Sequence, residues 1–207
     1  GGGGSRGVGA WGAAEGYEGQ LFEAMEAGGP GAWQCPGATS VSVFSGLFGV
    51  LSPADLIPDH RLAMGVSLPG FGVLSTWWAP RLDEALREEA SGQVVIDARS
   101  GPYRAACKAP WARVWELRVV READGQRSVI SHDAKRWRGA VTGTLLASGG
   151  YAAGETAECE QALTDAAHAV TLQDARGAEH CVNDVEFGPE KKTKHGGTTR
   201  AVTMVTN

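Results

Sequence analysis

Residues 44–65 read FSGLFGVLSPADLIPDHRLAMG and couple an apolar strand to a turn punctuated by glycines. A polar patch that ends in Arg61 follows the turn. Glycine adopts backbone angles that other residues avoid, and it lets a partner or ligand approach the main chain. A loop rich in Gly, Pro and charge, attached to an apolar strand, is a usual way to build a site on a rigid scaffold. This stretch therefore predicts a functional loop held by a sheet.

Outward from this stretch, the sequence alternates helical patterns with strand patterns. Trp78, Leu82 and Leu86 recur at helical spacing, and Asp124-Gly125 is a strong hairpin signal between two apolar runs. Helices are expected at 17–27, 75–89, 131–146 and 155–169, a turn at 69–72, and strands at 38–44, 94–98, 114–120, 128–130, 181–187 and 199–205. This mixture predicts an α/β (α+β mixed) fold, a single compact domain with a central mixed sheet.

Composition places the chain among ordinary globular proteins. Its 207 residues suit one domain, with 43% hydrophobic and 21% charged residues. The sequence lacks a run of about 18 apolar residues, so no membrane-spanning helix is expected. The net charge of −5 argues mildly against a dedicated nucleic-acid binder, although a local basic cleft can coexist with an acidic total. The four cysteines form no Cys-x-x-Cys pair, which predicts reduced thiols and no metal site.

The stretch at 44–65 resembles the YaaA family of bacterial peroxide-stress proteins. Members carry a Ser-Gly-Leu-aromatic-Gly turn, a Pro-x-Asp-x-Ile step and an Arg-Leu-x-Met-Gly segment, and all three occur here in that order. Three further family elements are matched by Tyr17-x-Gly19-x-Leu21-Phe22-x-Ala24, by Val94-Val95-Ile96-Asp97-Ala98-x-Ser100-x-x-Tyr103 and by Ser131-x-x-Ala134-Lys135-x-x-Arg138-Gly139. The resemblance covers residues 17–150 and is weak after Tyr151.

Two features depart from the family pattern. Family members open with a short strand and a Pro-Pro-Ser loop, whereas this chain opens with a glycine tract at residues 1–4. Residues 1–16 are therefore expected to be a flexible Gly-rich linker or scar, and residues 17–207 a YaaA-like domain that is truncated at its N-terminus. Ser52 stands where an arginine is common in the family, so one positive charge of the expected site is missing.

The resemblance implies a cytoplasmic role in the peroxide and oxidative stress response. Family members limit oxidative damage to DNA and proteins by lowering free intracellular iron, and they bind DNA. The resemblance also implies a YaaA-like fold with a helix-hairpin-helix-like element and a positively charged cleft. The expected partner is therefore DNA or a small anionic ligand, with no membrane and no cofactor.

The helix expected from Ser131 carries the best local evidence for a site. One apolar stripe on it must face the core: Ala134, Trp137, Val141 and Leu145. Lys135 lies near the helix start, where a cation is electrostatically unfavourable, and Arg138 lies at the edge of the stripe. Two such cations suggest an anion or a carboxylate partner, for which Asp97 at a strand end is a candidate. Both cations could instead reach water or form a structural ion pair.

The predicted anion or DNA site draws on several segments: Arg61, Lys135, Arg138, Ser45, Ser100 and Tyr103. Arg61 can bind phosphate or carboxylate through two N–H groups, or instead pair with Asp55 or Asp59. Ser100 could instead cap the helix that follows it. Trp77-Trp78 and the tryptophans at 111 and 115 could stack bases, although the helical spacing of Trp78 favours core packing.

A second hypothesis is an enzyme on the same scaffold, acting on a small metabolite or a nucleobase or sugar substrate. Lys135 next to Asp97 could attack a sugar carbon, or His132 could shuttle protons, because histidine titrates near neutrality. A P-loop, a Gly-x-Ser-x-Gly elbow and a dinucleotide fingerprint are all missing from the sequence. A third hypothesis is a non-catalytic interaction module.

Overall fold

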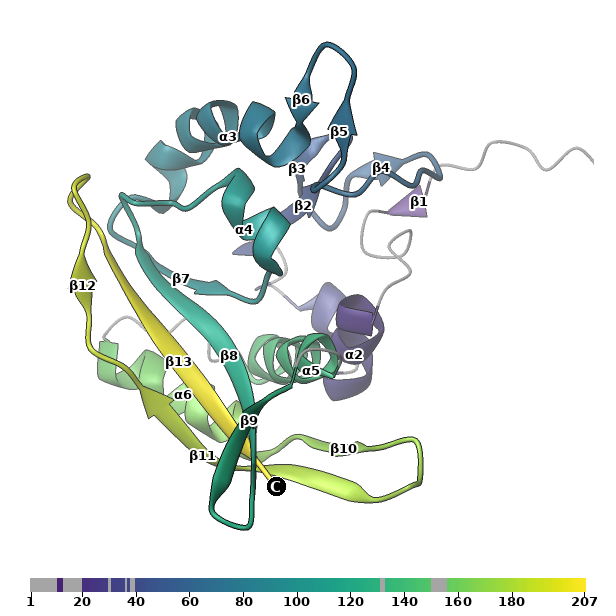
Figure 1. The fold of residues 1–207 in the computed structure, drawn as a ribbon, viewed down its shortest axis with the longest axis vertical. Coiled ribbons are helices and arrows are strands. Elements are labelled where there is room, and N and C mark those ends of the chain that lie inside the picture. Colours follow the sequence, from purple (N-terminus) through teal and green to yellow (C-terminus); the bar gives the residue numbers. More distant parts are fainter. Residues whose placement is uncertain are drawn as a thin grey trace, which may run out of the picture.

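The longest strand, β8 (Arg113–Ala123), lies inside a seven-stranded mixed sheet (Figure 1). The computed structural model describes residues 11–12, 20–29, 31–35, 37, 40–130, 133–149 and 156–207. β8 pairs in parallel with β7 (Val94–Asp97) and with β13 (Thr198–Thr206), and it forms a hairpin with β9 (Gln126–Val129). The predicted hairpin around Asp124-Gly125 is thereby confirmed.

The C-terminal half of the chain completes the sheet beyond β13. β11 (Glu179–Phe187) runs antiparallel to β13, β10 (Thr171–Gln173) runs antiparallel to β11, and β12 (Lys191–Lys192) pairs with the start of β13. β13 therefore lies between β8 and β11. The strands expected at 181–187 and 199–205 are confirmed, whereas β10 was not predicted, because three residues carry too little alternation to stand out.

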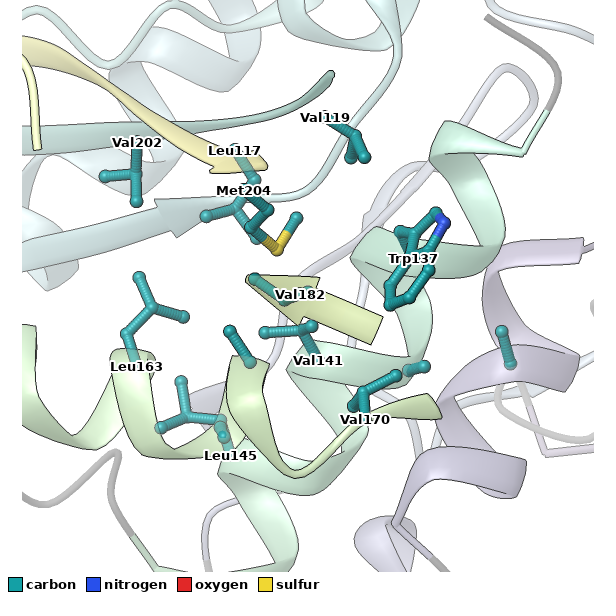
Figure 2. Close-up of a cluster of buried hydrophobic side chains, with 14 of the residues drawn as sticks. Leu117, Val119, Trp137, Val141, Leu145, Leu163, Val170, Val182, Val202 and Met204 are labelled. Atoms are coloured by element: carbon teal, nitrogen blue, oxygen red, sulfur yellow. The ribbon is translucent and has the colours of Figure 1, made fainter. Parts of the chain in front are cut away.

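Helices pack on both faces of the sheet, where β8 contributes apolar side chains to two separate cores. The flanking helices are α3 (Leu74–Ala90), α4 (Gly101–Ala106), α5 (Ala134–Ala147) and α6 (Thr156–His168). Trp115, Leu117 and Val119 of β8 pack in one core with α5 and α6, which Figure 2 shows in close-up. Val114 packs in a second core with α3 and α4. The predicted mixed α/β domain with a central mixed sheet is confirmed.

Helix α2 (Gln20–Gly28) crosses α5 at backbone contact (Figure 1). A Cβ atom built on Gly139 would overlap the carbonyl oxygen of Leu21, and one built on Gly143 would overlap that of Met25. α2 contributes a glycine to the same crossing, since a Cβ on Gly28 would overlap the carbonyl oxygen of Ala140 in α5. The glycines therefore set the distance between these two helices.

Short strands and one 3-10 helix occupy the N-terminal half of the chain. They are β1 (Trp11–Gly12) with β4 (Leu56–Ile57), β2 (Val43–Ser45) with β3 (Gly49–Leu51), β5 (Ser67–Leu68) with β6 (Gly72–Val73), and the 3-10 helix Ala32–Gln34. The turn expected at 69–72 is confirmed as the end of the β5–β6 hairpin. The strand expected at 38–44 is observed only from Val43, and residues 38 and 39 lie outside the described residues.

Several expectations change at the helix starts. α5 begins at Ala134 with Asp133 at its N-cap, and neither Ser131 nor His132 lies within the described residues. The apolar stripe of α5 does face the core through Trp137, Val141 and Leu145. The helix-hairpin-helix-like element stays a prediction, and residues 1–10 fall outside the described ranges. Across the described ranges, none of the helices has the length and apolar character needed to cross a membrane.

Candidate anion-binding site

Asp97 ends strand β7 and is the buried carboxylate around which the candidate site is built. Its side chain accepts hydrogen bonds from Arg99 Nε at 2.8 Å and Nη2 at 3.0 Å, and from Arg104 Nε at 3.1 Å. Burial raises the pKa of Asp97, but the hydrogen bonds and charge of Arg99, with the charge of Arg104, outweigh that effect and lower it. With 2% of its surface exposed, Asp97 is held ionised by two arginines rather than by Lys135.

Arg99 ties the end of β7 to the C-terminal turn of helix α4. Its Nη1 donates to the Tyr103 carbonyl at 3.2 Å, and its Nη2 donates to the Cys107 carbonyl at 2.8 Å. The guanidinium also lies 4.1 Å from the centroid of the Phe44 ring, a cation–π contact that links β2 to the site. Residues from the 44–65 stretch and from the strand-end segment therefore meet at Arg99.

Arg138 of α5 is the third guanidinium of the site and has no carboxylate partner among the described residues. Its Nη1 donates to the Arg99 carbonyl at 2.8 Å, and its Nε donates to the Ala134 carbonyl at 3.1 Å. Nη2 makes no hydrogen bond within the described ranges, and this nitrogen is not fully buried. Burial and the charge of Arg104 lower the pKa of Arg138, and Asp97 partly offsets them. This cation is 9% exposed and lacks a matching negative charge.

Glu116 of β8 supplies the second carboxylate. It lies 3.5 Å from Arg104 Nη1 and 3.1 Å from Arg118 Nη2. We call the resulting group the arginine cluster; it consists of Arg99, Arg104, Arg118, Arg138, Asp97 and Glu116. Four guanidinium groups accompany two carboxylates, so two positive charges are unmatched within it; the Arg118 side chain is 59% exposed, and the other three guanidinium groups are partly buried. A partly buried excess of positive charge is costly unless an anion compensates it, which makes the arginine cluster suited to bind phosphate or carboxylate.

Ser45 organises the loop next to the arginine cluster. Its hydroxyl accepts the N–H groups of Leu47 and Phe48 at 3.3 Å each and lies 3.3 Å from His60 Nε2. His60 Nδ1 lies 3.0 Å from the Pro58 carbonyl, which can only accept, so Nδ1 is the donor in this hydrogen bond. Ser45 is 1% exposed with all its bonds made internally. It therefore positions the segment that leads to Arg61.

Two glycines seat the 44–65 stretch against its neighbours. A Cβ on Gly46 would overlap the Leu62 carbonyl oxygen, and the Gly46 carbonyl itself accepts the Trp78 Nε1 proton at 2.9 Å. A Cβ on Gly65 would lie 3.4 Å from Pro102 at the start of α4. The glycine-punctuated turn is thus in backbone contact with the segment after Arg61, and that segment touches the helix bearing Arg104.

The remaining predicted site residues occupy different environments. Arg61 is exposed and forms no ion pair with Asp55, Asp59 or another described residue. Lys135 is exposed on the first turn of α5, three residues before Arg138 and so on the same side of the helix. Ser100 is the N-cap residue of α4, but its side chain makes no capping hydrogen bond. Tyr103 packs against the second core. His132 is not among the described residues.

Arg99, Arg104, Arg118 and Glu116 belong to the arginine cluster but were not predicted as site residues. The strand-end segment offered one usable signal, because Asp97-x-Arg99 places a cation two residues after a buried carboxylate. The tryptophans at 111 and 115 are buried in the two cores and are not available to stack bases. Within the described part of the chain, no group of three His, Cys, Asp or Glu residues could hold a metal ion, and the four cysteines form no disulfide.

Comparisons with known proteins agree with the motifs. A family model described as peroxide stress protein YaaA matches residues 6–156. A UPF0246 protein of Streptomyces coelicolor is 39% identical over 165 residues, which cover 78% of this chain and 62% of that protein. A UPF0246 protein of Corynebacterium efficiens is 33% identical over 147 residues, which cover 69% of this chain and 58% of that protein. The chain therefore spans less than two thirds of the length of these curated relatives.

Proposed function

The chain belongs to the family of peroxide stress protein YaaA, and from that membership we propose that it acts in the cytoplasmic response to peroxide. We further propose that its arginine cluster binds phosphate groups and that the phosphates are those of DNA. The observation that carries this proposal is Arg138, a residue that is 9% exposed and has no carboxylate partner among the described residues. Arginine matches phosphate geometry through paired N–H groups, and Arg99 and Arg104 supply further donors beside it.

Lys135 and Arg61 would extend the phosphate contacts beyond the arginine cluster. Lys135 lies one helical turn from Arg138, and its ammonium group is free of ion pairs to described residues. Arg61 is held by the segment that Ser45 and His60 fix, and it also lacks a carboxylate partner within the described ranges. Exposed cations of this kind bind a polyanion without a large desolvation cost, since they keep most of their hydration until contact.

A Lys135→Ala variant tests the proposal through the salt dependence of DNA binding. The affinity of the unmodified chain for a duplex oligonucleotide should fall steeply with salt concentration, because phosphate contacts release counterions. Lys135→Ala should reduce the slope of log K against log salt by about one unit. Binding measured by fluorescence anisotropy across a salt series gives this slope, and thermal unfolding should stay unchanged because Lys135 is exposed.

Lys192→Ala is the matched control. Lys192 is also an exposed lysine, but it lies on β12 beside the start of β13, so that β13 and β8 separate it from the strand β7 that bears Asp97. Lys192→Ala should therefore leave the slope of log K against log salt unchanged. Equal slopes for Lys135→Ala and Lys192→Ala would contradict a phosphate contact at Lys135. Salt-independent binding, or no binding, by the unmodified chain would contradict the proposed function as a whole.

A further inference from the structure

The β5–β6 hairpin presents an aromatic ring that the arginine cluster does not use. Phe71 follows the hairpin tip at Pro69-Gly70 and is 54% exposed. Figure 1 shows the hairpin extending away from the sheet beside α3. A Cβ built on either Gly70 or Gly72 would meet nothing within 4 Å, so the tip stands clear of the described residues around it.

Phe71 is braced by a series of aromatic contacts that leads into the protein. Its ring meets the Trp77 ring edge to face at 5.6 Å, and Trp77 meets Trp78 in the same way at 4.7 Å. Trp78 is anchored by its hydrogen bond to the Gly46 carbonyl. The exposed ring is therefore held in one orientation, and little side-chain entropy is lost when a flat partner stacks on it.

The charges around the hairpin favour a polyanion. No acidic residue occurs in the sequence between Asp59 and Asp83, whereas Arg61 and Arg81 both lie in that segment. The Arg81 guanidinium lies 3.7 Å from the Trp77 ring centroid, and Arg81 has no carboxylate partner within the described ranges. Arg81 thus places a guanidinium on the ring that braces Phe71, and an aromatic ring with a cation close by matches a nucleobase and its phosphate.

We propose that Phe71 stacks on an exposed nucleobase of single-stranded or locally unstacked nucleic acid whose backbone is held by the arginine cluster. This inference rests on the proposed function. The two sites are physically connected, because Gly65, at the base of the hairpin segment, packs against Pro102 of α4, the helix that carries Arg104. The hairpin segment also exposes Val66 and Val73, but only two arginines, Arg61 and Arg81, accompany them between Asp59 and Asp83, fewer cations than a surface that binds anionic lipid usually carries.

Two oligonucleotides of equal length separate base stacking from phosphate binding. Oligothymidine carries both bases and phosphates, whereas an abasic oligomer carries the phosphates alone. Phe71→Ala should weaken binding of oligothymidine about tenfold, as expected for loss of one aromatic stacking contact, and should leave binding of the abasic oligomer unchanged. Phe71→Trp should retain the affinity for oligothymidine. Photocrosslinking with 5-iodouracil in place of thymine should map to Phe71.

Val129→Ala is the matched control, because Val129 is an 84% exposed apolar residue of β9, on the separate β8–β9 hairpin. It should change neither affinity. If Phe71→Ala binds oligothymidine as well as the unmodified chain does, or weakens both oligomers equally, the stacking inference is wrong while a steep salt slope would still support the proposed function. Phe71-dependent binding to anionic phospholipid vesicles without base-dependent binding would also overturn it. Failure to bind either single-stranded oligomer overturns the stacking inference, and failure to bind the duplex as well overturns both proposals.

Discussion

Replacing Gly143 by alanine is expected to lower the free energy of unfolding by about 3 kcal/mol, at the upper end of the cost of overpacking a core. The added methyl group would overlap the Met25 carbonyl oxygen, and both partners are helix backbone that cannot rotate away. α2 and α5 must therefore separate, which also disturbs the core contacts of Met25 and Leu146. Urea denaturation followed by circular dichroism measures the loss.

Gly101→Ala provides the control for this experiment. Gly101 is the first residue of α4, and a Cβ there would meet nothing within 4 Å. The same chemical change should be neutral or slightly stabilising, because alanine restricts the unfolded chain. If Gly143→Ala and Gly101→Ala unfold at the same urea concentration, the backbone contact between α2 and α5 does not constrain the fold.

Asp97→Ala is expected to cost about 3–5 kcal/mol of stability, the range seen when one partner of a buried charge network is removed. Arg99 and Arg104 would lose their shared carboxylate. Arg138 would lose the nearby negative charge that partly offsets its burial and the positive charge of Arg104. Glu116 would then be the one carboxylate left in the arginine cluster, and Arg118 already pairs with it. Urea denaturation at pH 7 measures this loss.

The pH dependence of the same variant gives an independent check. The pKa of Asp97 is lower in the folded state than its ordinary value of 3.8, so its contribution is complete above that value and is lost as the pH falls through the folded pKa. The difference between Asp97→Ala and the unmodified chain should therefore be constant at neutral pH and shrink below about pH 3.8. Asp165→Ala, at an exposed aspartate of α6, should show little difference at any pH. A pH-independent difference would mean that lost packing, rather than lost charge, explains the effect.

The sequence predicts the long periodic elements well and the short ones poorly. The stripe of Trp137, Val141 and Leu145 identifies the buried face of α5, because periodicity over several turns reflects packing directly. α4 was considered only as a helix for Ser100 to cap and was given no bounds, because six residues beginning with Gly-Pro give no periodic signal. Such short helices depend on tertiary contacts, here the hydrogen bonds from Arg99 to the carbonyls of Tyr103 and Cys107.

The candidate site was predicted in part. Asp97 and Arg138 were named from motifs, but the expected pairing of Asp97 with Lys135 is replaced by pairs with Arg99 and Arg104. Arg99 lies two residues away, so it reaches the carboxylate at a much smaller entropic cost than a side chain from a distant helix. The contact between Arg138 and the Arg99 carbonyl joins residues 39 positions apart, and no local pattern encodes such a contact.

The position of β13 has a consequence for how the polypeptide matures during translation. Until Thr198–Thr206 has emerged from the ribosome, β8 and β11 have no neighbour on their facing sides, and each presents a row of unpaired backbone groups. Nascent chains stalled before this strand would therefore expose two unpaired strand edges that can pair with other chains. They would also expose the apolar side chains that Val202 and Met204 cover. Chaperone binding to the nascent chain should accordingly persist until β13 has emerged and then fall abruptly.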